Sequence, residues 1–424
     1  MELKEFIDRS PTPLHAVETA RTWLKNSGWV ELKEADAWKL EPHQPYFWEK
    51  HGQGLILFKL GDLEPNLDAP RVVAAHTDSP ALKIKPNAKE LKSGALRYGI
   101  EIYGAPIVAT WTDRELGLAG AVVYRRDNAY HHRLVNFNQP LAIIPNLALH
   151  YQREVNTKGL VYDLKGQIQA LFEPNSLPEQ NLIVLLANQL GVDAANIVDV
   201  DLFLYDLAAA SILGRKEDGW FVSSRIDNLA SCYSILSSFD STPRPHTQVG
   251  VLFGAEEIGS MHPAGAQSLF LKGFFERLVF CRGGCPEDLY RQLARGFALS
   301  VDAAHGVHPN FSDKHDPAYS PILGKGIVLK LNSNYRYATH LAHSARWEEL
   351  CKKAGITYQR YFVRTDLAVG STVGPMLSAF TGLSTVDIGV PIWAMHSVRE
   401  TAHQKDLNDL TKLIQVHLGE TSNF

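Results

Sequence analysis

The chain has 424 residues, of which 45% are hydrophobic and 21% are charged, a composition typical of a soluble globular protein. Its formal charge of -4 at pH 7 excludes the basic surface that nucleic acids and anionic membranes attract, so we expect neither as a partner. A chain of this length exceeds one ordinary hydrophobic core, which favours two domains.

Two features of the sequence indicate a cytoplasmic protein. The charged segment Met1–Glu5 lacks the apolar stretch of a signal peptide, and no window reaches the roughly 18 apolar residues that a membrane helix needs. The four cysteines, Cys232, Cys281, Cys285 and Cys351, are too few for a disulfide framework. Their number indicates a reducing compartment.

The first 90 residues show an α/β pattern. Pro13 opens a predicted helix with one apolar face, and Gly28 ends it. Strand-like runs follow at residues 46–48 and 55–58. The segment Arg71–Ala75, apolar after its first residue, then predicts a fully buried strand.

The pattern changes between about Glu90 and Trp220. Short runs of alternating polarity are separated there by Gly, Pro and Asn, which predicts a mostly β region. One helix is predicted inside it, from Glu179 to Leu190, with Gly191 as its C-terminal cap.

After Asp227 the α/β rhythm resumes. The predicted elements are a helix after Asn228, a strand over Val249–Ala255, a helix after Pro263, strands over Ala298–Val301, Ile327–Leu331, Tyr358–Val363 and Thr385–Val390, and a last helix carrying Leu407, Leu410, Leu413 and Ile414. The sequence therefore predicts an α/β fold. A three-layer α/β domain with a mixed sheet, residues 1–88 and 223–424, is interrupted by an inserted β-rich domain, residues 89–222.

The adjacent carboxylates Glu256 and Glu257 follow the apolar run 249–255 and carry the most chemical information. Two neighbouring anions repel, so they need nearby cations, a metal ion, or protonation of one of them. With a divalent metal ion the two carboxylates can have different roles: one binds the ion and the other stays free as a general base.

Other candidate ligands share a position at or near the end of a predicted element: His76, Asp227, Asp302 and His396. The carboxyl ends of strands in an open α/β sheet face one crevice, so we expect these side chains to converge. Two His, two Asp and one Glu suit two zinc ions, with one carboxylate bridging both. The sequence thus predicts a two-metal hydrolase.

Some of these residues have a purely structural alternative. Asp227 is also typical of a helix cap, and Asp302 of a cap or a turn. Asp78 supports the metal interpretation of His76, since it follows two residues later. We expect it to accept the second N–H of the imidazole and so fix its tautomer.

Five segments resemble the signatures of the M18 family of aminopeptidases, the aspartyl aminopeptidases and their bacterial relatives. They are His76–Pro80, Ser224–Asn228, Glu256–Ser260, Ser300–His305 and Met395–Glu400. The order His, Asp, Glu-Glu, Asp, His matches the family, and the resemblance extends over essentially the whole chain. It implies a catalytic α/β domain interrupted by a β-rich dimerisation domain, and a homo-oligomer that forms a tetrahedral dodecamer.

The resemblance further implies a zinc-dependent aminopeptidase, a metallo-exopeptidase that removes N-terminal Asp or Glu from peptide substrates. Two zinc ions per subunit are implied, with Mn or Co as substitutes. The implied ligands are His76 and Asp302 at one ion, Glu257 and His396 at the other, and Asp227 between them. Glu256 is implied as the general base that takes a proton from the metal-activated water.

Two residues enter through the resemblance alone. His150 matches a further functional histidine of the family, and we expect it to reach the active site of a neighbouring subunit. The alternative is that His150 binds a metal ion. Lys330 matches the family lysine that pairs with an acidic substrate side chain. A buried ammonium selects Asp or Glu because leaving it unpaired costs free energy.

The Gly-rich stretch Val369–Pro375 is expected to hold backbone N–H groups near a substrate carbonyl. Just before it, Thr365–Ala368 departs from the common family pattern, which leaves the shape of the specificity pocket open. Within this segment, Asp366 is an alternative to Asp302 as a metal ligand.

Two other functions remain open at this point. A co-catalytic zinc amidase or deacylase would use the same centre on non-peptide amides. A non-catalytic assembly protein could keep the fold as a scaffold, although it would not need the free carboxylate of Glu256. Preference for a free or a blocked amine distinguishes the two enzymatic alternatives.

Overall fold

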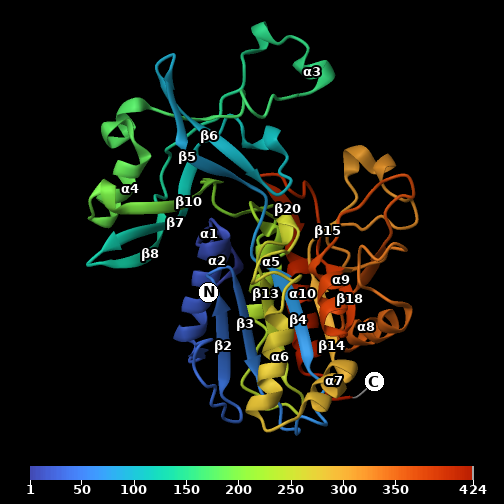
Figure 1. The fold of residues 1–424 in the computed structure, drawn as a ribbon. Helices are drawn as coiled ribbons and strands as arrows, with labels where there is room; N and C mark the ends of the chain where they lie inside the picture. The colour runs from blue at the N-terminus through green and yellow to red at the C-terminus, as the bar shows by residue number, and fades with distance from the viewer. Residues whose placement is uncertain (423–424) are drawn as a thin grey trace. The chain divides into compact units, whose positions relative to one another are not determined.

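The computed structural model describes residues 1–422, and the chain divides into two compact units (Figure 1). The first unit comprises Met1–Asp78, Ala210–Met395 and Glu400–Phe424. The second comprises Ser79–Ala209, together with the short segment His396–Arg399.

The ends of the second unit differ from the predicted insert of residues 89–222. At the first end, Leu82 and Ile84 pack in the core of the second unit, so the unit begins before residue 89. At the other end, Trp220–Ser223 pairs with Glu400–His403 inside the first unit. Residues 89–222 stay a prediction for the limits of the inserted domain.

Within residues 1–422, the first unit contains a nine-stranded sheet in the order β1-β2-β3-β13-β4-β14-β18-β16-β17 (Figure 1). The strands are β1 (Val30–Leu32), β2 (Pro45–Lys50), β3 (Gly54–Lys59), β4 (Arg71–His76), β13 (Gln248–Phe253), β14 (Phe297–Val301), β16 (Ile327–Lys330), β17 (Tyr358–Tyr361) and β18 (Ser384–Gly389). β13, β4, β14 and β18 run parallel, whereas β3 and β16 run antiparallel to their neighbours β13 and β18. The sheet is therefore mixed.

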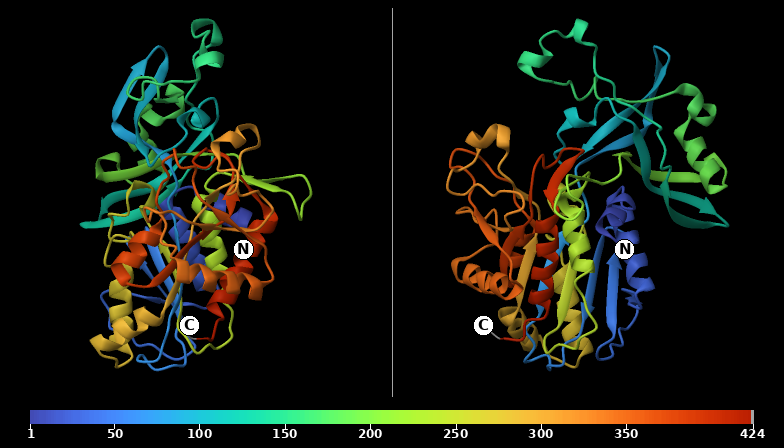
Figure 2. Two further views of the ribbon diagram at one scale, coloured as in Figure 1. Left: turned by 90° about the vertical axis from the view of Figure 1, so that its right-hand side faces the viewer. Right: turned by 180° about the vertical axis from the view of Figure 1, so that it is seen from behind.

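Helices cover both faces of this sheet. They are α1 (Leu3–Asp8), α2 (Pro13–Asn26), α5 (Ile226–Leu236), α6 (Phe270–Cys281), α7 (Pro286–Arg295), α8 (Leu341–Ala354), α9 (Val373–Thr381) and α10 (Gln404–Leu418). One core holds apolar residues of α2, α5, α8 and α10, and the other holds those of α6, α7 and α9. The rear view in Figure 2 brings α5 and α10 to the front of the sheet. The predicted three-layer α/β fold is confirmed.

The central strands β4 and β13 are apolar between their ends, at Val72–Ala75 and Val249–Phe253, because both of their faces are buried. In β4, Val72 and Ala74 pack with α6 and α9, whereas Val73 and Ala75 belong to the opposite core. Period-two alternation thus distributes consecutive apolar residues between two cores. This is why the sequence shows an uninterrupted run at residues 71–75.

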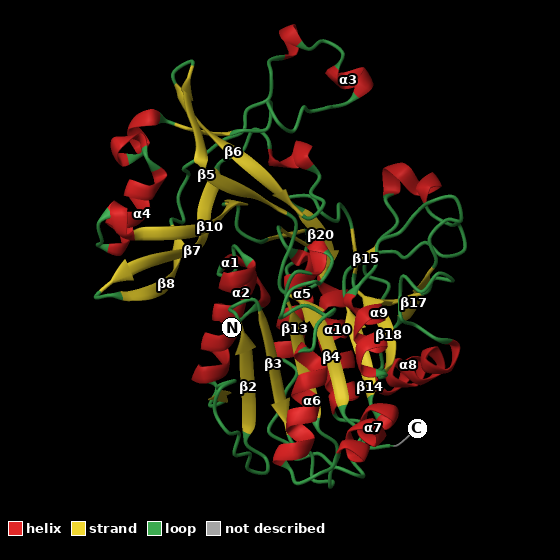
Figure 3. Cartoon of the chain, viewed as in Figure 1, coloured by secondary structure: helices red, strands yellow, loops and turns green. Residues whose placement is uncertain are grey.

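The second unit is β-rich, as predicted. In the described chain its strands form an antiparallel six-stranded sheet, ordered β8-β7-β10-β5-β6-β9. Its elements are β5 (Ala81–Lys92), β6 (Ala95–Tyr103), β7 (Leu116–Arg126), β8 (Ala129–Asn136), α3 (Val155–Lys158), β9 (Ala170–Phe172), α4 (Leu182–Leu190) and β10 (Ile197–Asp206). Figure 3 shows the strands in yellow and α4 in red.

The helix predicted from Glu179 begins later than expected, at Leu182. Asn181 is its N-cap, and the side-chain oxygen of Asn181 accepts the Ile183 N–H at 3.0 Å. Glu179 lies outside the helix and has a φ of 51°. The Asn cap, and not the preceding carboxylate, therefore sets the start of α4.

Two small sheets complete the first unit within residues 1–422. Their strands are β11 (Ser211–Leu213), β12 (Trp220–Ser223) and β20 (Glu400–His403) in one, and β15 (Ala304–His305) and β19 (Pro391–Ile392) in the other. In the part of the chain that the structure describes, none of the helices combines the length and the apolar character needed to cross a membrane.

His417 gives the fold a predictable response to pH. Burial, and then the neighbouring Arg71 and Arg346, lower its pKa to about 3, although Glu420 and a hydrogen bond to the Val72 carbonyl oppose this. Between pH 6.5 and 3 the unfolded chain binds a proton that the folded chain does not, so stability falls as the pH falls.

We therefore expect the pH-dependent loss of stability to be smaller in His417→Gln. Between pH 6.5 and 4.5 the wild type should lose about 2–3 kcal/mol more stability than the variant, measured by urea unfolding of both proteins at each pH. Parallel stability–pH curves would contradict this role for His417.

Candidate metal centre

Four of the predicted side chains come from one edge of the large sheet. β13, β4 and β14 are adjacent and parallel, so their carboxyl ends meet. His76 is the last residue of β4, and Asp302 directly follows β14. Glu256 and Glu257 begin a short 3-10 helix, Glu256–Ile258, after β13. The topology therefore brings the candidates from distant parts of the sequence together.

The turn after β13 directs both glutamates to this edge. Ala255, which precedes them, has a φ of 61°, a left-handed conformation that a residue with a side chain rarely adopts. The chain therefore leaves the strand direction at Ala255, and the alternation that would separate Glu256 from Glu257 ends there. Strain of this kind gathers at functional sites.

Asp227 comes from the first turn of α5, where the backbone departs from helical geometry. The Asp227 N–H donates to Oε2 of Glu400 at 3.0 Å. Next to it, the Asn228 side-chain amide donates to the Val301 carbonyl at 2.8 Å. These two bonds fix the turn against β20 and against the end of β14, from which Asp302 extends.

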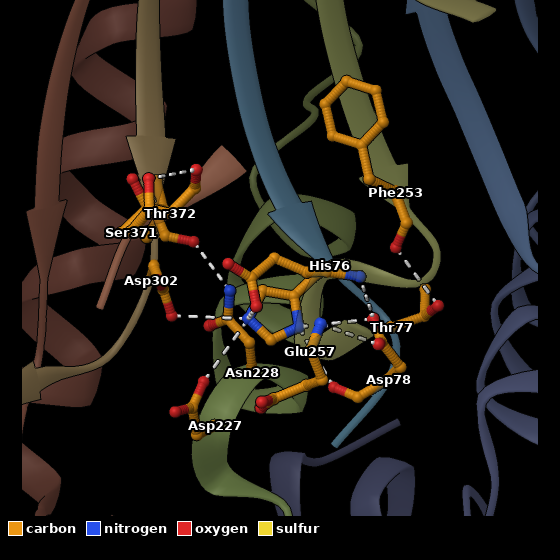
Figure 4. Close-up of polar contacts among 12 residues, drawn as sticks. His76, Thr77, Asp78, Asp227, Asn228, Phe253, Glu257, Asp302, Ser371 and Thr372 are labelled. Atoms are coloured by element: carbon orange, nitrogen blue, oxygen red, sulfur yellow. Dashed lines mark hydrogen bonds and ion pairs between the residues drawn. The ribbon is translucent and has the colours of Figure 1, made fainter. Parts of the chain in front are cut away.

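The side chains surround the imidazole of His76 (Figure 4). Its Nε2 lies 3.4 Å from Oδ1 of Asp227, 3.4 Å from Oδ1 of Asp302 and 4.0 Å from Oε2 of Glu256. The potential ligand atoms of His76, Asp227 and Asp302 lie within 4.8 Å of one another, as do those of His76, Glu256 and Glu257. The side chains of His76, Asp227 and Asp302 are 1–10% exposed.

Asp78 contacts His76 differently from the prediction. The Nδ1–H of His76 donates to the backbone carbonyl of Asp78 at 3.0 Å, whereas the Asp78 carboxylate is 3.6 Å away. That carboxylate accepts the N–H groups of Glu256 and Glu257 at 3.0 and 3.1 Å. Asp78 thus leaves Nε2 as the ligating nitrogen of His76 and also holds the backbone of the glutamate pair.

Burial and charge shift the pKa values of the cluster in opposite directions. Burial, reinforced by Asp302, Asp78 and Asp227 and opposed by His76, raises the pKa of Glu256 to about 8. Burial and then Asp227 also raise the pKa of Glu257. For Asp302, burial acts to raise the pKa, but the Lys330 ammonium and His76 outweigh it and hold the pKa well below its ordinary value.

These side chains fit a metal ion. One imidazole and four carboxylates form the N/O donor set that zinc and similar divalent ions accept. Burial acts to lower the pKa of His76, but Asp227, Asp302 and Asp78 outweigh it and raise that pKa well above its ordinary value. A proton on Nε2 and a divalent cation would compete for the same lone pair, and the cation would also relieve the repulsion among the carboxylates.

Lys330 forms an ion pair with Asp302. It is buried at the end of β16, and its Nζ lies 3.4 Å from Oδ2 of Asp302 and 5.4 Å from the ring centre of Tyr337. Lys330 thus touches the cluster through one of its candidate ligands. Asp366, the alternative to Asp302, is exposed and pairs with Arg364 at 2.6 Å.

Two predicted residues belong to the second unit. His150 is exposed in the short 3-10 helix Leu149–Tyr151. His396 belongs to the segment His396–Arg399, and its Nδ1–H donates to the Ala105 carbonyl at 3.0 Å. Their roles beside the carboxylates of the first unit stay predictions from the sequence.

The contacts of Asp78 lead to a testable result. Asp78→Ala removes the acceptor of two backbone N–H groups and should let the Glu256–Glu257 turn shift. We expect kcat/KM and metal affinity to fall about 10–100-fold, as for other residues that support metal ligands. Asp78→Asn, which keeps one acceptor oxygen, should lose less. Metal titration and peptide hydrolysis on both variants measure this, and equal losses would contradict the two-acceptor role.

Comparison with known proteins decides the family. The family model described as "Aminopeptidase I zinc metalloprotease (M18)" matches residues 6–417. The chain belongs to the M18 family. It is thus a metallo-aminopeptidase, a hydrolase of a zinc metalloprotease family, as the sequence predicted.

Similar proteins support the M18 assignment. The chain is 38% identical over 419 residues to "Probable M18 family aminopeptidase 2" of Ectopseudomonas mendocina (strain ymp), covering 97% of this chain and 96% of the relative. It is 32% identical to the chain solved in "Cryo-EM structure of the Ape4 and Nbr1 complex", with a TM-score of 0.92 and 98% and 84% covered. For "Structure of S. cerevesiae mApe1 dodecamer" the identity is 24%, the TM-score 0.82 and the coverage 98% and 94%, which supports the fold.

Two supporting residues of this M18 site were not found from the sequence. The acceptor role of Asp78 toward Glu256 and Glu257 depends on the turn at Ala255, which the sequence does not show. Glu400, which accepts the Asp227 N–H, lies four residues after His396 in one of the quoted segments. The presence of Glu400 in a family signature segment was the only indication that it has a role. Nothing in the spacing of the sequence linked Glu400 to Asp227.

Proposed function

We propose that this M18 enzyme removes acidic N-terminal residues from peptides with two zinc ions per subunit and with Glu256 as general base. The observation that carries the proposal is the convergence of His76, Asp227, Glu256, Glu257 and Asp302 within one buried cluster. Of these residues, His76 and Asp302 would bind one ion and Glu257 the other, with Asp227 between them. His396 would complete the second site.

The roles of the side chains follow from their chemistry. Bound zinc would polarise the substrate carbonyl and lower the pKa of a water molecule toward neutrality. Glu256 then accepts a proton from the attacking water and returns it to the leaving amine. Glu256 is adjacent to the proposed ligand Glu257, and its Oε2 lies 4.0 Å from Nε2 of His76, so its carboxylate lies beside the proposed ligands, where a proton acceptor is needed.

Lys330 supports the acidic preference. Its ammonium is buried and contacts Asp302, so it lies beside the proposed zinc ligands. The carboxylate that Lys330 contacts, Asp302, is also a proposed zinc ligand. A substrate carboxylate would therefore give the Lys330 ammonium a counter-charge of its own. Lys330→Met should therefore reduce the preference for Asp or Glu over Ala at the substrate N-terminus.

We further propose a homo-oligomer, a tetrahedral dodecamer, in which His150 reaches a neighbouring subunit's active site. The mApe1 relative is described as a dodecamer. Leu149 and Tyr151, on either side of His150, are 51% and 82% exposed. Exposed apolar residues beside a functional side chain suit a subunit contact. His150→Phe should impair turnover with normal zinc content; the loss of a metal equivalent would make His150 a ligand instead.

A scan of peptides that differ only in the first residue tests the proposal. We expect fastest release of Asp or Glu, no release from N-acetylated peptides, and about two zinc ions per subunit in the same sample. Manganese and cobalt should restore the metal-depleted enzyme as substitutes. Faster cleavage of blocked substrates would instead make the protein an amidase. The proposed cytoplasmic location is tested separately, by fractionating the source cells.

A further inference from the structure

A cavity of about 560 Å³ in the first unit has no role in the proposed chemistry. Its walls come from the loops after β16 and β17 and from Asp316 and Tyr319, which precede β16 in the sequence. A second hollow of about 240 Å³ shares Val363, Leu367, Ala368 and Val369 with it, so the two hollows adjoin at these residues and together make up one groove. We name this groove the 336/363 groove, after Arg336 and Val363.

Several contacts connect the 336/363 groove to the metal centre. The smaller hollow is lined by His305, three residues after Asp302, and by Tyr361. Tyr361 lies 6.5 Å from Tyr337, which packs against the Lys330 ammonium at 5.4 Å. Lys330 in turn contacts Asp302. The groove therefore extends away from the candidate zinc ligands within the same unit.

One wall of the groove is rich in hydrogen-bond donors. Arg336 is exposed, and among residues 1–422 its guanidinium has no ion-pair or hydrogen-bond partner. Oδ1 of Asn332 accepts the Asn334 N–H at 2.9 Å, which leaves the Asn332 NH2 group to donate. The carboxylate of Asp316 also lines the cavity, and it accepts the Ala318 N–H at 2.9 Å.

The opposite wall is apolar. Tyr319 and Phe362 pack edge to face with ring centres 4.8 Å apart, and Val363 and Leu367 continue this surface. A groove with donors on one side and aromatic and aliphatic groups on the other matches an extended peptide. Its carbonyls and carboxylates would face Arg336 and Asn332, and its apolar side chains would face Phe362.

We propose that the 336/363 groove holds the part of the peptide downstream of the scissile bond, and that Arg336 pairs there with a carboxylate. This inference rests on the proposed aminopeptidase function. The carboxylate is either an acidic side chain or the C-terminal group of a short peptide. Guanidinium favours such a partner because it binds carboxylates through two parallel hydrogen bonds.

Matched peptides test the proposal on the zinc-loaded enzyme. All share the N-terminal residue that the enzyme releases fastest, followed by three alanines and a C-terminal amide. One set replaces one alanine by Glu at each position in turn, and another keeps the alanines but has a free C-terminal carboxylate. We expect at least one of these sets to raise kcat/KM roughly fivefold through a lower KM, the factor that about 1 kcal/mol gives.

The Arg336→Gln variant should lose this preference, and Arg336→Lys should keep part of it. Arg291→Gln, a matched change on α7 outside the groove, should retain it. The Glu set and the free-acid set distinguish the side-chain from the C-terminal source. The proposal is overturned if the wild-type enzyme cleaves the neutral peptide but shows no preference, or if Arg336→Gln keeps the preference. Failure to cleave any unblocked peptide would instead contradict the aminopeptidase function.

Discussion

Glu256→Gln should lower kcat by about 10²–10⁴-fold while the zinc content stays unchanged. The substitution keeps the size of the side chain and its hydrogen-bonding oxygen but removes the group that accepts the proton. Glu256 is not one of the proposed ligands, so the substitution leaves the proposed ligand set intact and zinc should stay bound. Single-turnover hydrolysis and metal analysis of the same preparation measure both quantities.

Glu257→Gln is the matched control for this prediction. The two glutamates are adjacent, and both backbone N–H groups are held by Asp78. If Glu257 is a ligand and Glu256 the base, Glu257→Gln should lose metal and Glu256→Gln should not. Substantial turnover by Glu256→Gln, or metal loss from it, would remove Glu256 from the role of base.

Asp227→Ala should abolish turnover, by roughly 10³-fold or more, because it removes the carboxylate proposed to contact both ions. The structure places Asp227 3.4 Å from His76, on a turn whose backbone N–H donates to Glu400. We expect the zinc content to fall below that of the wild type. Equilibrium dialysis against zinc, followed by metal analysis, measures the loss.

Asp366→Ala is the matched control for Asp227→Ala. Asp366 is exposed and pairs with Arg364, away from the imidazole of His76. We expect its removal to leave the zinc content unchanged. If Asp366→Ala lost zinc and Asp302→Ala did not, Asp366 would be the ligand in place of Asp302.

Much of the site could be predicted because its residues occupy positions that the sequence marks. His76, Glu256 and Asp302 each follow an apolar run, and parallel strands bring such positions to one edge. The runs are continuous because both faces of the sheet are buried, so they were recognisable without any alternation. The family signatures then gave the individual roles.

Other features depend on three-dimensional contacts that no spacing encodes. The acceptor role of Asp78 depends on the turn at Ala255, and the support of Asp227 comes from Glu400, 173 residues away. The start of α4 depended on which of several polar residues caps it, and Asn181 was chosen over Glu179. Local propensity could not decide these cases because each is settled by one or two specific hydrogen bonds.

The most direct test is to measure zinc content and release of the N-terminal residue on one sample, before and after chelation and again after zinc is returned. We expect about two zinc ions per subunit, loss of essentially all turnover with the metal, and recovery on its return. Full turnover by zinc-free protein would contradict the metal centre at His76, Asp227 and Asp302.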